Sequence, residues 1–390
     1  MPDNASLGAA KTAKNDEFYT QYSDIEAEMN AYVEFNPDVF REKTILLPCD
    51  DPEWSNFTKY FAANFERFGL KKLISTSYAK GAGNHQITMF EMLSPLYDET
   101  KHQAHGKLFT LTRDKDGSGN IDTDDIEFSG YLEGGGDFRS EEVTKLRDEA
   151  DIIITNPPFS LFREFLSWIM EGKKQFIIIG SKNVITYKEV FPLLKDNVIW
   201  LGPGFPAGNA YFRISPEDAR EFASGVYNED TGLVKFRNVG WFTNVDHGQR
   251  HEILQLDTMA HNLKYNRQLK KKVAGRNGVV TYPVYDNCEA IEVPFVECIP
   301  SDYAGLMGVP ITFLDRYNPD QFMILGLSRD MDIPTKTGMK KEFLDLYFSQ
   351  GGTGTMQPGH PDLCYYDADG NAVVPYRRII IRHKKGESGQ

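Results

Sequence analysis

The stretch Ile152-Ile153-Ile154-Thr155-Asn156-Pro157-Pro158-Phe159 says more about the fold of this chain than any other. Its first half is a short apolar run, and the two prolines that follow end the run abruptly. Such a pattern is typical of a strand buried in a parallel sheet and followed by a rigid loop. In open α/β sheets, ligands bind beyond the carboxyl ends of the strands. We therefore expect residues 156–159 to lie at the ligand-binding edge of a sheet.

The loop presents groups that can hold an amine. Proline has no backbone N–H, so the carbonyls of Pro157 and Pro158 are acceptors with fixed directions, and the carboxamide oxygen of Asn156 is another. An amine that donates both hydrogens there has its lone pair directed at an electrophile, while an aromatic base stacks on Phe159. These four residues are thus predicted to catalyse alkylation of an exocyclic amino group. The alternative is a Pro-Pro turn that only ends a strand, because short motifs recur by chance.

Most of the first 250 residues alternate apolar runs with helical patterns, which predicts an α/β fold with a doubly wound, mostly parallel sheet of the Rossmann-like kind. The expected strands are residues 45–47, 72–75, 152–155, 176–180 and 198–201, and the expected helices include residues 56–68 and 161–171. From about residue 251 the pattern changes to short strands interrupted by Pro and Gly. Since 390 residues exceed what one core usually serves, we expect two domains, 1–250 and 251–390.

The cysteines and the apolar segments predict a protein of the cytoplasm. Cys49, Cys288, Cys298 and Cys364 are scattered, without CxxC pairs or His partners at metal-ligand spacing. This pattern argues against a disulfide framework and a zinc site, and it favours a reducing compartment. No apolar stretch approaches the roughly 20 residues needed to cross a bilayer, and the first residues lack the cationic and apolar segments of a secretion signal. We expect a soluble, cytoplasmic protein with no membrane partner.

The formal net charge of −13 argues against DNA binding, because cations that displace counterions from phosphate drive that binding. The basic residues are nevertheless concentrated in two clusters. One acid-free stretch, interleaved with polar and aromatic side chains, predicts contacts to double-stranded DNA through Lys264, Arg267, Lys270, Lys271, Lys272 and Arg276. A second cluster near the end of the chain contains Arg377, Arg378, Arg382, Lys384 and Lys385. The alternative for either cluster is a solvated face.

Residues 156–159 fit the (N/D/S)PP(Y/F) motif of amino-methyltransferases, and the whole chain resembles the EcoRI-type adenine-specific DNA methyltransferase family. The resemblance is carried, in order, by residues 15–20 (NDEFYT), 45–57 (ILLPCDDPEWSNF), 136–140 (GDFRS), 156–160 (NPPFS), 240–244 (GWFTN) and 309–314 (VPITFL). It implies an S-adenosylmethionine-dependent methyltransferase domain followed by a C-terminal target-recognition region. The implied reaction is methylation at N6 of an adenine flipped out of duplex DNA. The implied setting is a restriction-modification system, in which a cognate restriction endonuclease acts on the same site without a stable complex.

Acidic residues at strand ends are candidates for binding the ribose and adenine of the cofactor. The usual glycine-rich turn of methyltransferases is absent after the first expected strand, and residues 48–54 (PCDDPEW) stand in its place. The family shares this substitution. The resemblance therefore assigns to the cofactor Phe18, Tyr19, Pro48, Asp50, Asp51 and Trp54, with Asp137 and Phe138 at its adenine. The alternatives are a helix N-cap for Asp50 and Asp51 and a core position for Trp54.

One further motif points to a different chemistry. Residues 114–125 match a calcium-binding EF-hand loop, with oxygen ligands at positions one, three, five and nine and Gly119 at position six. The flanking residues 108–112 and 126–131 are β-branched and aromatic, so they predict the strands of a hairpin rather than helices, and Asp125 replaces the usual bidentate Glu. We expect a polar hairpin tip and no metal site.

Two other classes of protein remain open. A protein-glutamine N5 methyltransferase would use a similar Asn-Pro-Pro loop, but it would need neither the long C-terminal region nor the basic stretch. A non-catalytic DNA- or calcium-binding relative would bind no S-adenosylmethionine.

Overall fold

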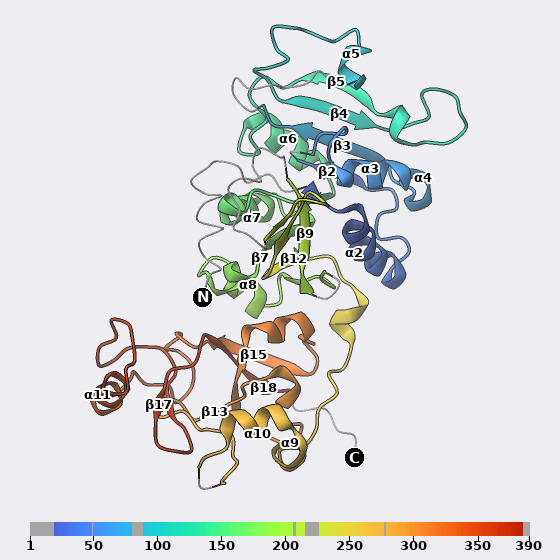
Figure 1. Ribbon diagram of the computed structural model, residues 1–390. Helices are drawn as coiled ribbons and strands as arrows, with labels where there is room; N and C mark the ends of the chain where they lie inside the picture. The colour runs from blue at the N-terminus through green and yellow to red at the C-terminus, as the bar shows by residue number, and fades with distance from the viewer. Residues whose placement is uncertain are drawn as a thin grey trace. The chain divides into compact units, whose positions relative to one another are not determined.

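The computed structural model describes residues 19–48, 50–79, 89–205, 208–214, 226–276 and 278–384 (Figure 1). The chain divides into two compact units. Unit 1 combines the residues up to Val184 with Ile199–Gly248. Unit 2 combines Ile185–Val198 with the residues from Gln249 onward.

An eight-stranded sheet forms the centre of unit 1. Its strands, in spatial order, are β5 (Glu127–Tyr131), β4 (Lys107–Leu111), β3 (Lys72–Ser77), β2 (Thr44–Leu47), β6 (Ile152–Thr155), β7 (Gln175–Ser181), β12 (Val239–Thr243) and β8 (Trp200–Leu201). The central strands β3, β2, β6 and β7 run parallel, and the strands at both flanks pair antiparallel. The predicted α/β class is confirmed, in a sheet that is parallel at its centre.

The strand order places a topological switch point between β2 and β6. From β2 the chain moves outward to β3, β4 and β5, and it then returns to the other side of β2 as β6 before moving outward again to β7. Ligands of doubly wound sheets bind beyond the carboxyl ends of the strands at such a point. The loops that begin at Pro48 and at Asn156 follow these two strands, so the fold brings both to the expected site.

The central strands are covered on both faces, which explains their unbroken apolar sequences. All residues of β2 and β6 are buried. Helices α3 (Asn56–Ala63), α6 (Glu141–Glu149) and α7 (Phe162–Glu171) pack on the sheet, and α2 (Tyr22–Phe35) packs on α3. Two shorter helices are α4 (Phe65–Phe68) and α5 (Met89–Met92). Gly180 of β7 leaves room for Phe162 of α7, because a β-carbon there would lie 2.3 Å from the Phe162 ring.

A second, smaller sheet of unit 1 is antiparallel. Its strands, in spatial order, are β1 (Tyr19–Thr20), β9 (Ala210–Arg213), β11 (Leu233–Phe236) and β10 (Tyr227–Asn228). Burial alternates along β9, with Ala210 and Phe212 buried and Tyr211 and Arg213 exposed. This period of two is expected for a sheet with one covered and one open face.

Unit 2 is built on a four-stranded sheet in the order β13 (Ala290–Glu292), β14 (Leu306–Pro310), β18 (Arg378–His383) and β15 (Phe322–Leu327), with β13 parallel to β14. A hairpin pairs β16 (Tyr365–Tyr366) with β17 (Ala372–Val373). The helices are α8 (Phe191–Lys195), α9 (Met259–Tyr265), α10 (Arg267–Val273) and α11 (Lys341–Ser349). α8 packs on β15, with Phe191 and Leu194 buried.

The described part of the chain also contains short 3-10 helices at Thr123–Asp125, Phe159–Leu161, Lys182–Thr186, Gly248–His251, Val296–Cys298 and Ile311–Arg316. No helix within the described ranges has the length and apolar character that a membrane span requires.

Candidate functional site

The loops after β2 and β6 are joined by hydrogen bonds at the switch point. The Thr155 hydroxyl, at the end of β6, lies 3.0 Å from the Pro48 carbonyl oxygen and 2.6 Å from Oδ2 of Asp50. Both acceptors belong to the loop after β2. The residue just before the Asn-Pro-Pro-Phe loop is therefore tied to the acidic segment that the sequence predicts for the cofactor.

Asp50 connects three parallel strands. Its carboxylate accepts from Ser55 Oγ at 2.6 Å and from Thr155, while its carbonyl accepts from Thr58 Oγ1 at 2.8 Å and from Ser75 Oγ of β3. Asp50 is 8% exposed, and its burial raises the pKa of this carboxyl to about 7, although the Ser55 and Thr155 hydroxyls act in the opposite direction. The group therefore holds the carboxyl ends of β2, β3 and β6 together.

Asp51 and Trp54 occupy the more open part of the same loop. Oδ1 of Asp51 accepts from the Glu53 backbone N–H at 2.9 Å, and burial raises its pKa to about 6, with Lys107 opposing the shift. The N-cap of α3 is Ser55, whose Oγ accepts from the Phe57 N–H, so the N-cap alternative for Asp50 and Asp51 is wrong. Trp54 is 53% exposed, which excludes the core alternative for its ring.

A buried polar cluster lies close to Asp51. Glu91 is fully buried and contacts Lys107 Nζ at 2.5 Å, His102 Nδ1 at 2.8 Å and the Tyr131 hydroxyl at 2.5 Å. Burial acts to raise the pKa of Glu91, but its hydrogen bonds to Lys107, Tyr131 and His102 outweigh burial and lower it. Sequence reasoning missed this cluster, because its members come from three separate segments with no common motif.

Asp137 and Phe138 follow a glycine run that approaches the end of β3 closely. Gly136 has a φ of +83°, and a β-carbon there would lie 2.4 Å from the Ser77 carbonyl oxygen, so this approach requires glycine. Asp137 accepts from Arg139 Nε at 2.9 Å and Nη2 at 2.6 Å, and this guanidinium lowers the pKa of the carboxyl. The Phe138 ring is buried against Phe165 and Trp168, at ring-centroid distances of 5.0 and 5.6 Å.

The predicted catalytic loop combines buried and accessible groups. Pro157 is buried, whereas Asn156, Pro158 and Phe159 are half-buried. The Phe159 ring is held edge-on by two rings of the small sheet, Phe212 of β9 and Phe236 of β11, with centroids 6.3 and 6.2 Å away.

Two further features of this region concern the small sheet. Sequence reasoning missed Phe212 and Phe236, whose only local signal is the alternation of their strands. Of the predicted N-terminal cofactor residues, Tyr19 lies in β1 of the same small sheet, and Phe18 falls outside the described residues.

The EF-hand-like stretch connects the antiparallel strands β4 and β5, so the predicted hairpin is confirmed. Oxygen atoms of Asp114, Asp116 and Asp125 lie within 4.8 Å of one another. The Asp125 carboxylate accepts from the backbone N–H groups of Lys115 at 2.7 Å, Asp116 at 3.2 Å and Asp122 at 3.0 Å. These bonds stabilise the hairpin tip.

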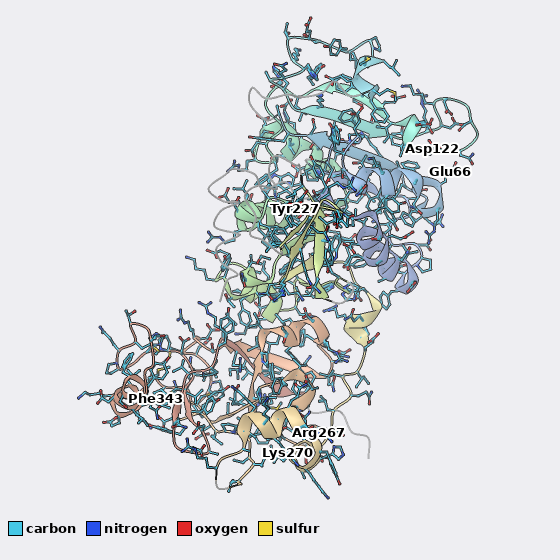
Figure 2. The ribbon with its side chains drawn as sticks, viewed as in Figure 1. Glu66, Asp122, Tyr227, Arg267, Lys270 and Phe343 are labelled. Carbon is cyan, nitrogen blue, oxygen red and sulfur yellow. The ribbon has the colours of Figure 1, made fainter. Side chains whose placement is uncertain are left out.

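Five residues of the first basic cluster lie in the helix pair α9–α10 of unit 2, and Arg276 follows α10 (Figure 2 labels Arg267 and Lys270). The Asn266 side chain caps α10 by accepting from the Leu269 N–H at 2.9 Å, and Leu269 and Val273 anchor the helix in the core. The predicted DNA-contacting side chains lie around this anchor. Lys270 is half-buried, and the others are exposed: Lys264, Arg267, Lys271, Lys272 and Arg276.

The structure also shows which basic residues have acidic neighbours. Arg276 lies 3.7 Å from Asp369, which the sequence places far away. In the second cluster, Arg378 binds the buried Glu292 through Nε and Nη2, at distances down to 2.6 Å. Glu292 also accepts from the Tyr285 hydroxyl. Arg378 is thus part of a structural ion pair with a buried carboxylate. Lys385 lies outside the described residues.

The sheet is parallel at its centre, and an Asn-Pro-Pro-Phe loop lies beside an acidic strand end at its switch point. These two features define an α/β methyltransferase that acts on amino groups. Residues 6–384 match the model of the family described as adenine-specific methyltransferase EcoRI. The chain belongs to this family, and it is therefore an enzyme of the adenine-specific type II DNA methyltransferase class.

Curated relatives support this assignment. The type II methyltransferase M.EcoRI of Escherichia coli is 40% identical over 84% of this chain and 91% of its own length. M.MgeORF184P of Mycoplasma genitalium and M.MpnI of Mycoplasma pneumoniae, both also type II methyltransferases, are each 31% identical over 81% of this chain, and the matches cover 84% and 83% of their own lengths. No solved structure is significantly similar to the chain.

Proposed function

We propose that this enzyme transfers a methyl group from S-adenosylmethionine to N6 of an adenine that has left the base stack of duplex DNA. One observation carries the proposal: the hydroxyl of Thr155, the residue just before the β6 loop, donates a hydrogen bond to the Asp50 carboxylate. It brings the loop suited to holding an amine beside the acidic strand end suited to the cofactor. The adenine must leave the duplex because its amino group is otherwise paired and stacked.

The residues at the strand ends fit S-adenosylmethionine, which when bound supplies an electrophilic methyl group. Asp51 is an acidic acceptor beside an exposed aromatic ring, Trp54, at the carboxyl end of β2. The Ser55 and Thr155 hydroxyls donate hydrogen bonds to the Asp50 carboxylate, so Asp50 contributes to the cofactor site by positioning these two residues. The Phe138 ring is in the core, so a cofactor contact at this residue falls to its backbone. The full assignment is Phe18, Tyr19, Pro48, Asp50, Asp51, Trp54, Asp137 and Phe138.

Catalysis rests on positioning the amine. The Asn156 carboxamide oxygen and the Pro157 carbonyl oxygen accept its two hydrogens, and the base stacks on Phe159. The nitrogen lone pair then attacks the methyl carbon in line, forming the N–C bond as the carbon–sulfur bond breaks. The surplus proton leaves to solvent after the transfer. The motif contains no strong general base, so orientation provides most of the rate enhancement.

The proposal extends to the partners and the setting of the enzyme. The α9–α10 helix pair contacts phosphates of double-stranded DNA through Lys264, Arg267, Lys270, Lys271, Lys272 and Arg276, and unit 2 contributes to target recognition. The enzyme works in the cytoplasm within a restriction-modification system, and a cognate restriction endonuclease acts on the same site without a stable complex.

A methyl-transfer assay tests the proposal directly. Purified protein is incubated with radiolabelled S-adenosylmethionine and with either unmethylated amplified DNA or protein extract. We expect label in DNA, recovered as N6-methyladenine, and methylation-sensitive sequencing then gives the recognised site. Label on protein glutamine, or no transfer to either substrate, contradicts the proposal.

A further inference from the structure

The small sheet of unit 1 has two chemically different faces. In its register Lys235 pairs with Tyr211, and Val234 pairs with Phe212. Paired residues of antiparallel strands project to the same face, and neighbours along a strand project to opposite faces. One face thus carries the buried Phe212 and Val234, while the other carries Tyr211, Lys235 and Arg213, with Leu233 opposite Arg213. We call the second the outer face, and we group with it the exposed Arg237, which directly follows β11.

The outer face is cationic and aromatic. The ammonium group of Lys235 lies 5.8 Å from the centre of the Tyr211 ring, which is 39% exposed. Arg213 and Arg237 are exposed, and within the described residues neither they nor Lys235 forms an ion pair with a carboxylate. Three cations that pair with no carboxylate among the described residues, in a chain of net charge −13, create a local positive potential that suits a polyanion.

This face lies directly behind the residues that hold the catalytic ring. Phe212 and Phe236, which contact Phe159, are the chain neighbours of Arg213, Lys235 and Arg237. Arg213 and Lys235 therefore project from the other side of the same two strands, and Arg237 follows the end of β11. A base that stacks on Phe159 remains covalently joined to the phosphates on either side of its sugar, so backbone phosphates must pass close to this sheet.

We propose that the outer face, formed by Tyr211, Arg213, Lys235 and Arg237, binds backbone phosphates of the DNA strand that carries the target adenine. The proposal rests on the proposed function, because it uses the position of the flipped base. It adds a DNA contact of unit 1 to the contacts assigned to α9–α10 in unit 2. Contacts of this kind position the strand without reading its sequence.

The test replaces the three cations together, as Arg213→Gln, Lys235→Gln and Arg237→Gln. We expect the slope of log affinity against log salt for unmethylated duplex DNA to become shallower by up to about three. The KM for DNA should rise at least tenfold at 0.15 M salt, while the affinity for S-adenosylmethionine, measured by calorimetry, stays within twofold. The charge-conserving variant Arg213→Lys, Lys235→Arg, Arg237→Lys should retain the wild-type slope.

A matched control removes the same charge elsewhere in unit 1, through Lys71→Gln, Lys101→Gln and Arg113→Gln. These side chains are exposed, and Lys71 precedes the amino end of β3 in the eight-stranded sheet. The control should leave the slope and the KM unchanged. If the triple variant does not fold, Arg237→Gln alone should lower the slope by about one.

An unchanged slope in the triple variant overturns the proposal. Weaker S-adenosylmethionine binding with an unchanged slope also overturns it, and would assign this face to the cofactor, since Tyr19 lies opposite Arg213 in the register. Failure of the proposed function is distinguishable, because the wild-type enzyme would then transfer no methyl group to DNA.

Discussion

Asn156 is the residue on which the proposed chemistry depends most. If its carboxamide accepts an amine hydrogen mainly as the transition state forms, Asn156→Ala should lower turnover by orders of magnitude while S-adenosylmethionine binding stays near wild type. Single-turnover methylation and calorimetry measure the two quantities. Retention of more than about a tenth of the wild-type turnover would exclude this role.

Phe159 should behave differently, because stacking contributes to capture of the base. Phe159→Ala should weaken binding of the flipped adenine by roughly 1–3 kcal/mol, and Phe159→Trp should be tolerated better because it keeps an aromatic face. The measurement compares the KM for DNA of the two variants at a fixed salt concentration. Equal KM values in both variants would show that the ring serves packing against Phe212 and Phe236 rather than the base.

Asp50 should make the stability of the protein depend on pH. Its pKa is raised from 3.8 to about 7, so the folded state keeps a proton that the unfolded state releases. The associated stability is complete below pH 4 and is lost as the pH rises toward and through 7, by an amount on the order of 2–4 kcal/mol. Asp50→Asn keeps the shape of the side chain but cannot titrate. The unfolding free energy of this variant should therefore fall less than that of the wild type as the pH rises over this range.

Urea unfolding of the cofactor-free protein at pH 4 to 8 compares Asp50→Asn with the wild type. Other buried carboxyls, such as Glu28 with its pKa of about 8, contribute equally to both proteins and cancel in the difference. Parallel curves would mean that Asp50 is already ionised in the folded state.

The Asn-Pro-Pro-Phe loop could be located from sequence because its determinants are local: an apolar run, two prolines and an aromatic ring. The residues around it could not. Phe212 and Phe236 reach Phe159 from strands more than 50 positions away, and Glu91 reaches Lys107 and Tyr131 across three segments. Tertiary packing decides such contacts, and no periodicity within a single element encodes them.

At the scale of elements, the helix pair α9–α10 carries the second proposed DNA contact. Lys270→Ala, Lys271→Ala and Lys272→Ala together should reduce the slope of log affinity against log salt by up to about three, because each lost phosphate contact reduces it by about one. The hydrophobic anchor, Leu269 and Val273, is untouched, so the helix should persist. Filter binding to unmethylated duplex DNA across a salt series gives the slope.

The matched control for this helix removes three exposed cations elsewhere in unit 2, through Lys188→Ala, Arg316→Ala and Lys341→Ala. It should bind DNA with the wild-type slope. If the α10 variant matches the control, α10 faces solvent and the sequence cluster was only a solvated surface.

The strands were easier to predict than their partners. The central strands β2, β3, β6 and β7 were visible as apolar runs because both of their faces are buried. The pairing of β1 with β9 was not visible, because a two-residue strand has no periodicity and its register depends on residues almost 200 positions away. The ion pair of Arg378 was not visible for a related reason, since its buried partner Glu292 lies in another strand.

At the scale of the whole molecule, the charge of −13 should weaken binding to DNA that lacks the target site. Neutralising exposed acids of unit 1, as in Glu34→Gln, Glu66→Gln and Glu99→Gln, should tighten non-specific binding several-fold at low salt and have little effect at high salt (Glu66 is labelled in Figure 2). Competition with non-target DNA measures the change. An equal gain in affinity for non-target DNA at all salt concentrations would show that local contacts, and not the overall electrostatic field of the protein, cause the change.

The division of the chain into units has a consequence for how such enzymes can diverge. Residues 185–198, which include α8, belong to unit 2 although they lie between β7 and β8 of unit 1. In the proposed function, unit 2 contributes to target recognition. A recombination event that exchanges only the gene segment from residue 249 onward would combine the β15 of one enzyme with the α8 of another, although these two elements pack on each other. A productive exchange of target specificity would need matched crossovers on both sides of α8 as well, so new specificities should arise more readily by point substitution than by shuffling.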